Sequence, residues 1–194
     1  MRLAIFGGTF DPIHTAHLAV ARETADRFHL DRVLFIPAAR PPHKQHGPCA
    51  PYEDRVRMAE LATAGDPRFR VSRLEAGTAR SYSIDTIAKV RAEMAPEDEL
   101  FFIIGADAFA EIRTWHRWRD VAAAVRFIVV NRPHSVYSPP AEVTYDRLDT
   151  LSLEISSSDI RRAITAGERP PDLSPPVFDY IQSHDLYQSE GSPN

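Results

Sequence analysis

The sequence has a single cysteine, no long apolar run and no excess of positive charge. With only Cys49 in 194 residues, the chain closes no intrachain disulfide and builds no thiolate metal site, so a reducing compartment is expected. The first apolar run, residues 3–6, is too short for a signal peptide or a membrane span. A net charge of −4 disfavours general binding to nucleic acid or membrane surfaces. We therefore expect a soluble cytoplasmic protein that has neither nucleic acid nor membrane as a partner.

What the sequence does contain is an alternation of strand-length and helix-length segments, with 43% hydrophobic residues to fill a core. Several apolar runs are continuous, as strands covered on both faces require. This pattern predicts an α/β fold, a single domain over residues 1–188 with a doubly wound parallel sheet, and a disordered tail at 189–194. The expected strands are 3–6, 32–36, 69–71, 100–104 and 126–130, and the expected helices are 18–28, 52–64 and 84–94.

In such a sheet the ligand binds beyond the carboxyl ends of the strands. The first of these ends carries Gly7 and Gly8, which allow backbone N–H groups to approach a ligand closely. Taken alone, the pair is better interpreted as a tight strand-to-helix turn. His14 and His17 follow at helical spacing, which places both rings on one face about 5–6 Å apart at Cβ. Phosphate contact is favoured over a zinc site or ordinary packing, because no well-spaced third metal ligand is present, and Asp11 or Thr15 is expected to cap this helix.

Segment 7–17, GGTFDPIHTAH, resembles the His-x-Gly-His signature of the nucleotidyltransferase superfamily, and most closely its bacterial nicotinate-nucleotide adenylyltransferase branch. The resemblance implies a Rossmann-like fold in which His14 and His17 are catalytic contacts to ATP. It also implies that Gly7, Gly8, Thr9 and Phe10 bind ATP. Ala16 stands where the family usually has glycine, which implies slightly altered loop packing.

A second segment, 155–161 (ISSSDIR), reads as a serine cap followed by a short helix that closes at Gly167. Arg161 is expected in the first helical turn, where the dipole disfavours a cation unless an anion lies in front of the helix. A solvated arginine beside Asp159 is the alternative from local sequence. The segment resembles the family's Ile-Ser-Ser-Thr-x-Ile-Arg signature, about 140 residues after the first. The resemblance implies that Ser156, Ser157, Ser158 and Arg161 bind ATP and that Arg161 is catalytic.

Other segments resemble the family's sites for the second substrate. The proline-rich loop 40–44 implies Lys44 as a catalytic, phosphate-neutralising contact, whereas His43 and His46 are interpreted as loop residues. Segment 79–86, ARSYSIDT, resembles the segment that receives the nicotinate ring. The resemblance also implies that Gly105 and Asp107 contact ATP. The mononucleotide contacts that it implies are Lys44, Tyr82, Ser83, Asp85, Thr86, Asp107, Trp115 and Arg132.

The tryptophan-rich segment 113–119 also carries arginines, and such a cluster can indicate single-stranded nucleic acid. One short cluster on an acidic chain is poor support for that function. Trp115 matches the family's pyridine-stacking residue, and Trp118 is expected in the core.

The resemblance implies adenylyl transfer from ATP to nicotinate mononucleotide, with Mg²⁺ carried mainly by the ATP phosphates and no metal held by the protein itself. Alternatives within the superfamily are adenylyl transfer to nicotinamide mononucleotide or phosphopantetheine, and cytidylyl transfer to a polyol phosphate. A silent dinucleotide sensor and a zinc-dependent hydrolase are alternatives of other classes. The sequence leaves homo-oligomerisation open.

Overall fold

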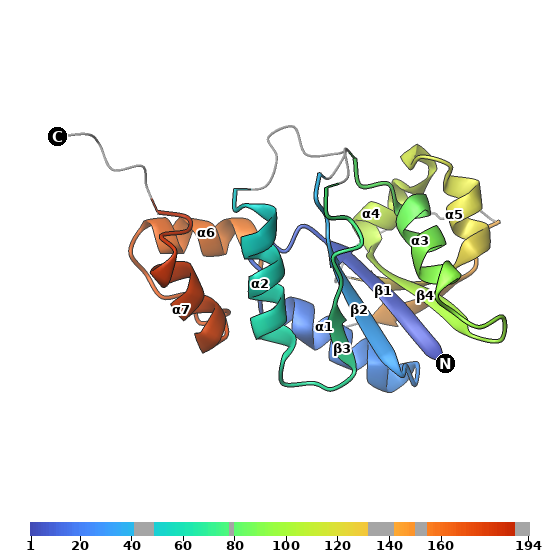
Figure 1. The fold of residues 1–194 in the computed structure, drawn as a ribbon, viewed down its shortest axis with the longest axis horizontal. Coiled ribbons are helices and arrows are strands. Elements are labelled where there is room, and N and C mark those ends of the chain that lie inside the picture. Colours follow the sequence, from blue (N-terminus) through green and yellow to red (C-terminus); the bar gives the residue numbers. More distant parts are fainter. Residues whose placement is uncertain (41–48, 78–79, 132–141, 150–154, 189–194) are drawn as a thin grey trace.

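The structure, a computed structural model, describes residues 1–40, 49–77, 80–131, 142–149 and 155–188. The tail expected at 189–194 lies outside the described residues, as do the loop at 41–48 and residues 132–141. Within the described ranges the helices and strands follow one another in a single α/β unit (Figure 1).

The strands are β1 (Arg2–Gly8), β2 (Arg32–Pro37), β3 (Phe69–Val71), β4 (Glu99–Gly105), β5 (Arg126–Asn131) and β6 (Tyr145–Asp149). The helices are α1 (Thr15–Arg27), α2 (Tyr52–Thr63), α3 (Ser83–Ala92), α4 (Ala106–Ala110), the 3₁₀ turn η1 (Ile112–Thr114), α5 (Trp118–Ala124), α6 (Ser157–Thr165) and α7 (Pro175–Ser183). The five expected strands are confirmed, each extended by at most two residues at either end.

The described strands form one parallel sheet in the order β3-β2-β1-β4-β5-β6. Alternate strand residues face opposite sides, so Phe101 and Ile103 pack with one core and Phe102 and Ile104 with the other. The first core is completed by α1, α2, α6 and α7, and the second by α3, α4 and α5. The doubly wound sheet expected from the continuous apolar runs is therefore confirmed.

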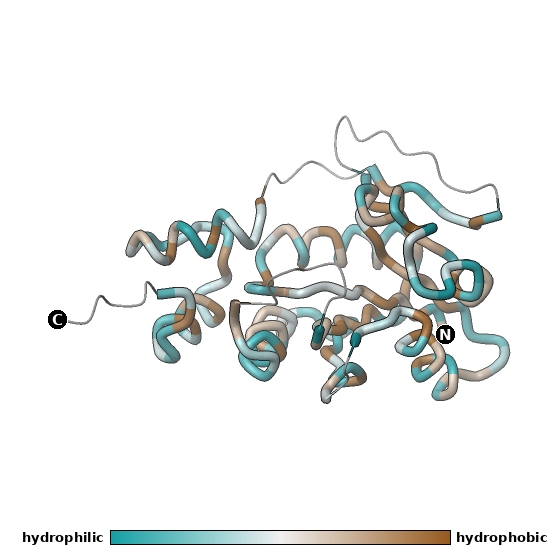
Figure 2. The backbone as a smooth tube through the Cα atoms, turned by 90° about the horizontal axis from the view of Figure 1, so that it is seen from above, coloured by the Kyte–Doolittle hydropathy of each residue, from teal (hydrophilic) through white to brown (hydrophobic). Residues whose placement is uncertain are grey.

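The chain reverses its winding direction between β1 and β4, which are neighbours in the sheet. After β1 the chain passes to α1 on one face, and after β4 it passes to α4 on the other. Figure 2 shows hydrophobic stretches gathered in the interior between these layers. Such a divergence opens a crevice at the carboxyl ends of the two strands, which is where open α/β sheets bind their ligands.

The edge strand β6 was not expected from the sequence. Its sequence, YDRLD, contains three charged residues, and only Leu148 is fully buried. The strand is held instead by polar contacts. The Arg126 guanidinium donates to both carboxylate oxygens of Asp146 at 2.6 and 2.8 Å, and the Asn131 side chain donates to Asp149 at 2.9 Å. Hydrophobic periodicity carries no signal for a strand built this way.

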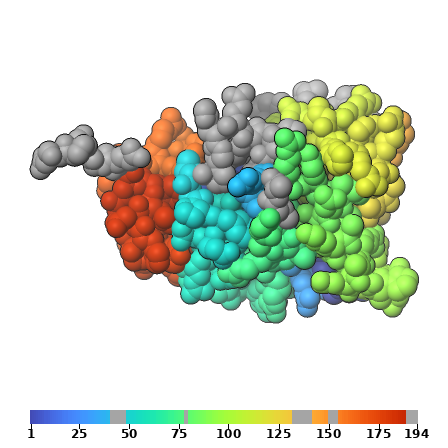
Figure 3. Space-filling view, turned by 45° about the horizontal axis from the view of Figure 1, so that its top comes forward, coloured from blue at the N-terminus to red at the C-terminus, as the bar shows by residue number. Residues whose placement is uncertain are grey.

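The last two helices, α6 and α7, lie together at one end of the molecule beside α2 (Figures 1 and 3). Pro175 and Pro176 begin α7, where a missing N–H costs nothing. The Tyr180 hydroxyl of α7 donates to Asp54 of α2 at 2.8 Å. Val177 and Ile181 are buried against the first core. The C-terminal helix α7 therefore packs onto α2 and the first core.

Candidate active site

A cavity of about 480 Å³ opens at the carboxyl ends of β1 and β4, in the crevice where the winding reverses. The ends of both strands, the entrance of α3 and the turn before α5 line it. The lining includes Gly7, Gly8, Tyr82, Ser83, Thr86, Gly105 and Trp115 from the expected contacts, together with Glu75, Arg80 and His116. Residues from both expected substrate sites therefore share one cavity.

Gly8 is required by close packing at the start of this loop. A Cβ at Gly8 would lie 2.9 Å from the ring of Phe10. Phe10 has a φ of 49°, which turns its ring back under the strand and buries it to 2% exposure. Because the Phe10 side chain is part of the core, Phe10 can contact ATP only through its main chain.

His14 and His17 lie against each other, as their spacing predicts, with ring centroids 3.8 Å apart. His14, and neither Asp11 nor Thr15, is the N-cap residue of α1, which begins three residues earlier than expected. The main-chain N–H of His14 donates to Nδ1 of His17 at 3.2 Å. A ring nitrogen that accepts a hydrogen bond carries no proton, so the neutral His17 ring carries its proton on Nε2. His17 is thereby fixed in the tautomer that presents an Nε2–H donor.

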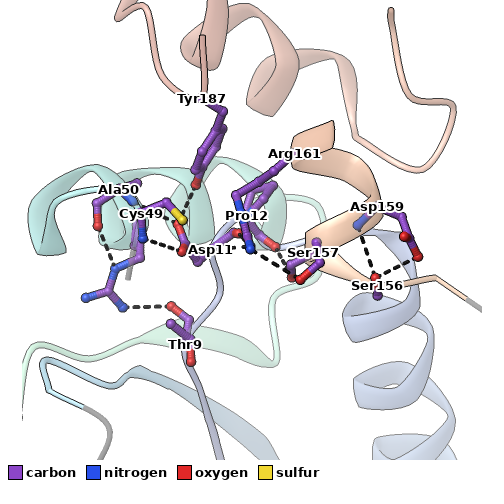
Figure 4. Close-up of polar contacts among 12 residues, drawn as sticks. Thr9, Asp11, Pro12, Cys49, Ala50, Ser156, Ser157, Asp159, Arg161 and Tyr187 are labelled. Atoms are coloured by element: carbon purple, nitrogen blue, oxygen red, sulfur yellow. Dashed lines mark hydrogen bonds and ion pairs between the residues drawn. The ribbon is translucent and has the colours of Figure 1, made fainter. Parts of the chain in front are cut away.

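The three serines at the start of α6 have three different partners, and Figure 4 shows those of Ser156 and Ser157. The Ser156 hydroxyl caps the helix by accepting from the Asp159 N–H at 3.1 Å. The Ser157 hydroxyl donates to the carbonyl oxygen of Pro12 at 3.0 Å. The Ser158 hydroxyl accepts from Nη2 of Arg161 at 3.2 Å. One cap accounts for one hydroxyl, and the other two tie α6 to the first signature and to its own arginine.

Arg161 is the residue that joins the two signature segments most directly. It is the fifth residue of α6, one position beyond the first turn in which it was expected. Its Nη1 donates to the carbonyl oxygen of Asp11 at 2.7 Å and lies 3.9 Å from the Asp11 carboxylate. The alternative of an arginine paired with Asp159 is wrong for Arg161, because Arg162 forms that ion pair. The two distant segments therefore meet in space.

The expected mononucleotide contacts divide into two groups. Tyr82, Ser83, Thr86 and Trp115 line the cavity, where Trp115 packs edge-on against Phe102 with centroids 5.9 Å apart. The carboxylates of Asp85 and Asp107 are exposed and are not among the residues that line it. Asp85 borders a shallower hollow beside the cavity, and Asp107 lies in the first turn of α4. Trp118, expected in the core, is half-buried against the second core.

Several expected contacts have no structural description here. Lys44, His43 and His46 lie outside the described residues, as does Arg132. Thr9 is described and half-buried, and its carbonyl oxygen accepts a hydrogen bond from Arg55 at 2.7 Å. The roles of these residues therefore stay predictions.

Arg55 was missed by the sequence reasoning although it organises the site. It is only 1% exposed and donates to the carbonyl oxygens of Thr9, Ala38 and Ala50 at 2.7, 2.8 and 3.2 Å. Burial lowers the pKa of this guanidinium, and the negative charge of Asp11 acts in the opposite direction. The signal in the sequence was its spacing: Arg55 is three residues from both Tyr52 and Met58, which places a charged residue on the face of α2 that also carries Met58.

Asp11 and Glu75 are two further residues that sequence reasoning did not assign to the site. The Asp11 carboxylate is 2% exposed and accepts from the main-chain N–H groups of Cys49 and Ala50 at 2.7 and 3.0 Å. Glu75 is 8% exposed, lines the cavity and accepts from the Thr86 hydroxyl at 2.8 Å. The latter contact holds the entrance of α3 in place.

Two features are absent from the described ranges. In those ranges no three or more His, Cys, Asp or Glu side chains are grouped so that they could hold a metal ion. No helix in the same ranges has the length and apolar character needed to cross a membrane.

The fold and the paired signatures define the class first. A family model described as cytidylyltransferase-like matches residues 5–163, and the sheet is that of a Rossmann-like nucleotidyltransferase. Among curated proteins, a probable nicotinate-nucleotide adenylyltransferase of Solibacter usitatus is 68% identical over 187 residues, covering 96% of this chain and all of that one. A protein of the same description from Thermus thermophilus is 43% identical, covering 97% of this chain and all of that one. The chain belongs to the nicotinate-nucleotide adenylyltransferase family.

Solved structures agree with this fold. The nicotinic acid mononucleotide adenylyltransferase of Plasmodium falciparum, complexed with NaAD, superposes with a TM-score of 0.79 at 20% identity, covering 96% of this chain and 97% of that one. A putative nicotinate-nucleotide adenylyltransferase from Vibrio parahaemolyticus gives a TM-score of 0.69, also at 20% identity, covering 97% and 96%. At this identity the likeness establishes the shared architecture.

Proposed function

We propose that the protein transfers the adenylyl group of ATP to nicotinate mononucleotide, giving nicotinate adenine dinucleotide and pyrophosphate in NAD biosynthesis. The observation that carries the proposal is the contact between the two signatures. Ser157 and Arg161 of α6 reach the carbonyl oxygens of Pro12 and Asp11 beside the histidine pair. Imidazole and guanidinium donors from distant parts of the chain are thereby held close to one oligophosphate site.

In the proposed reaction a phosphate oxygen of the mononucleotide attacks the α-phosphorus of ATP in line. The bond from that phosphorus to the bridging oxygen breaks, and pyrophosphate departs with the electron pair. The attacking phosphate is already ionised, so the protein needs no general base. What the chain supplies is alignment and charge stabilisation, which carry most of the catalysis in phosphoryl transfer. Mg²⁺ belongs to the substrate in this proposal, because it arrives bound to the ATP phosphates.

His14, His17, Lys44 and Arg161 are proposed to stabilise the phosphate oxygens. The histidine pair supports a phosphate contact, because the ring centroids lie 3.8 Å apart and the His17 tautomer presents an Nε2–H donor that a phosphate oxygen can accept. Gly7, Gly8, Thr9, Phe10, Gly105, Asp107 and the serines 156–158 complete the proposed ATP site. A Cβ at Gly8 would lie 2.9 Å from the Phe10 ring, so this position admits only glycine. A glycine here fits a loop that receives phosphate on its backbone N–H groups.

The mononucleotide is proposed to place its ring between the α3 entrance and Trp115. Tyr82, Ser83, Asp85, Thr86, Asp107, Trp115, Lys44 and Arg132 are the proposed contacts. The N-terminal end of α3 borders the cavity through Tyr82 and Ser83, and the positive end of a helix dipole favours a carboxylate over a neutral amide, so nicotinate is proposed as the preferred ring. We also propose a cytoplasmic location, which fits the reducing compartment favoured by the single cysteine.

A pyrophosphate-release assay with Mg²⁺-ATP and nicotinate mononucleotide tests the proposal. The wild-type protein is expected to release pyrophosphate, and to use the acid in preference to the amide mononucleotide when both are offered. Absence of release with the acid would overturn the activity. Turnover with phosphopantetheine alone would favour another branch of the superfamily, and nucleotide binding without turnover would favour a sensor.

Arg161→Ala tests the site. Removing a donor of this kind is expected to lower kcat by roughly 10²- to 10³-fold, about 2.7–4 kcal/mol of barrier. Arg162→Ala is the matched control, because Arg162 is the next residue of the same helix and forms its ion pair with Asp159 at the surface. Equal rates for the two variants would contradict the proposed role of Arg161 while leaving the activity itself in place.

A further inference from the structure

Tyr187 brings the C-terminal segment into the contact between the two signatures (Figure 4). Its hydroxyl donates to Oδ1 of Asp11 at 2.8 Å. Its main-chain carbonyl oxygen accepts from the Thr165 hydroxyl, at the end of α6, at 2.7 Å. The side chain is thus held from both ends, by α6 behind it and by the first signature in front of it.

Asp11 is the group through which Tyr187 reaches Arg161. Oδ1 of the carboxylate accepts from Tyr187 and from the Ala50 N–H, and Oδ2 accepts from the Cys49 N–H. Oδ2 also lies 3.9 Å from Nη1 of Arg161, which donates to the carbonyl oxygen of the same aspartate. Each hydrogen bond to the carboxylate fixes its orientation and reduces the negative charge that it presents to the guanidinium.

We propose that Tyr187 is a positioning residue for the adenylyl transfer: its hydroxyl, acting through Asp11, sets how the Arg161 guanidinium is presented to the triphosphate. This inference rests on the proposed function. Without the Tyr187 donor, the Asp11 carboxylate attracts the guanidinium more strongly and is less firmly oriented. Arg161 is then drawn toward Asp11 and away from the phosphate oxygens.

The chemistry of Tyr187 suits a permanent donor. Burial and the neighbouring Asp11 carboxylate raise the pKa of its hydroxyl above the usual value for tyrosine. The proton therefore stays on the tyrosine across the neutral range. The side chain lies beside Arg161 and its hydroxyl proton is donated to Asp11, so its effect on the reaction is exerted through Asp11.

Tyr187→Phe removes the hydroxyl and keeps the ring. We expect kcat/KM for ATP to fall roughly tenfold, since hydrogen bonds to charged groups carry about this weight, whereas KM for nicotinate mononucleotide changes by less than about twofold. Tyr180→Phe is the matched control. It removes another C-terminal hydroxyl that donates to a carboxylate at 2.8 Å, that of Asp54 on α2. This control is expected to lower stability similarly and to leave the ATP parameters unchanged.

A double-mutant cycle separates positioning from packing. The affinity for a non-hydrolysable ATP analogue is measured by calorimetry for wild type, Tyr187→Phe, Arg161→Ala and the double variant. If Tyr187 acts through Arg161, its substitution costs nothing further in the Arg161→Ala background. Independent losses in the two backgrounds, or equal behaviour of Tyr187→Phe and Tyr180→Phe, would overturn the inference.

Thr165→Val keeps the test decisive if Tyr187→Phe does not fold. This change removes a hydroxyl that lies 2.7 Å from the Tyr187 carbonyl oxygen and 2.9 Å from that of Arg161, and it leaves both the tyrosine ring and the guanidinium in place. A fall of about threefold in kcat/KM for ATP is expected, and unchanged ATP parameters would overturn the inference. A wild-type protein that releases no pyrophosphate would instead contradict the proposed function, which distinguishes the two failures.

Discussion

Single charged residues hold the loops around the site through main-chain groups. Among the described residues, Arg55 donates to three carbonyl oxygens and Asp11 accepts two main-chain N–H groups, so each charge helps to order a loop. A buried charge is tolerated when its hydrogen bonds are satisfied in this way. At this scale the motifs in the sequence predict which residues contact substrate. The buried supports are harder to find, since neither Arg55 nor Asp11 differs in composition from a surface charge.

Asp66, in the turn before β3, is a single residue that makes the stability of the fold depend on pH. Its carboxylate accepts from the main-chain N–H, Nε and Nη2 of Arg68 at 2.9–3.0 Å, and these bonds hold its pKa below the usual 3.8. A carboxyl whose pKa is depressed by folding stabilises the fold above its unfolded pKa and loses that contribution as the pH falls through the folded pKa.

Asp66→Asn is therefore expected to lose about 1–2 kcal/mol of unfolding free energy at pH 7. The difference from wild type should shrink as the pH falls below about 4. Urea denaturation at several pH values measures both. Asp26→Asn is the control, because Asp26 also pairs with Arg68 but is largely exposed. A loss for Asp66→Asn that persists unchanged at pH 2 would contradict the electrostatic origin.

At the scale of elements, apolar periodicity was sufficient for the interior of the sheet and insufficient for its edge. β4 and β5 are buried on both faces, and their continuous apolar runs predict them directly. β6 depends on Arg126 and Asn131 of its neighbour, and a pairing between side chains is invisible to a pattern read along one segment. The beginning of α1 was misjudged for a related reason, since His14 takes the cap position that a hydroxyl or carboxylate usually occupies.

Ser156→Ala tests the capping of α6 at this scale. The Ser156 hydroxyl accepts from the Asp159 N–H and donates to the Asp159 carboxylate. Loss of this cap is expected to lower the unfolding free energy by about 1 kcal/mol. Ser158→Ala is the comparison, because Ser158 lies in the same turn and caps nothing. Chemical denaturation of both variants measures the difference, and equal stabilities would count against the cap.

For the whole molecule, the site depends on contacts between chain segments that are far apart in sequence. The loop after β1 is held by α2 through Arg55, by α6 through Ser157 and by the C-terminal segment through Tyr187. The doubly wound fold and the meeting of the two signatures were predictable from the sequence. The contact of Tyr187 with this loop was not predictable, because no local pattern marks one tyrosine near the C-terminus as a partner of Asp11.

Ligand binding is expected to stabilise the chain as a unit, because the proposed ATP site spans β1, α1 and α6. A non-hydrolysable ATP analogue at about 100 times its Kd adds about 2.7 kcal/mol. This gain corresponds to a rise in Tm of roughly 5–10 °C for a chain of this size. Scanning fluorimetry measures the rise. Arg161→Ala is expected to lose most of it at the same analogue concentration, and Arg162→Ala to keep it.

The hydrogen bond between Tyr187 and Asp11 has a consequence for biosynthesis on the ribosome. A growing chain exposes its amino-terminal half first, and strands β1 to β3 can pair while later segments are still being translated. The loop after β1 nevertheless obtains its last donor only when residue 187 has left the exit tunnel. Nascent chains halted before that residue would carry a largely formed sheet around a phosphate site in which Asp11 lacks the Tyr187 donor.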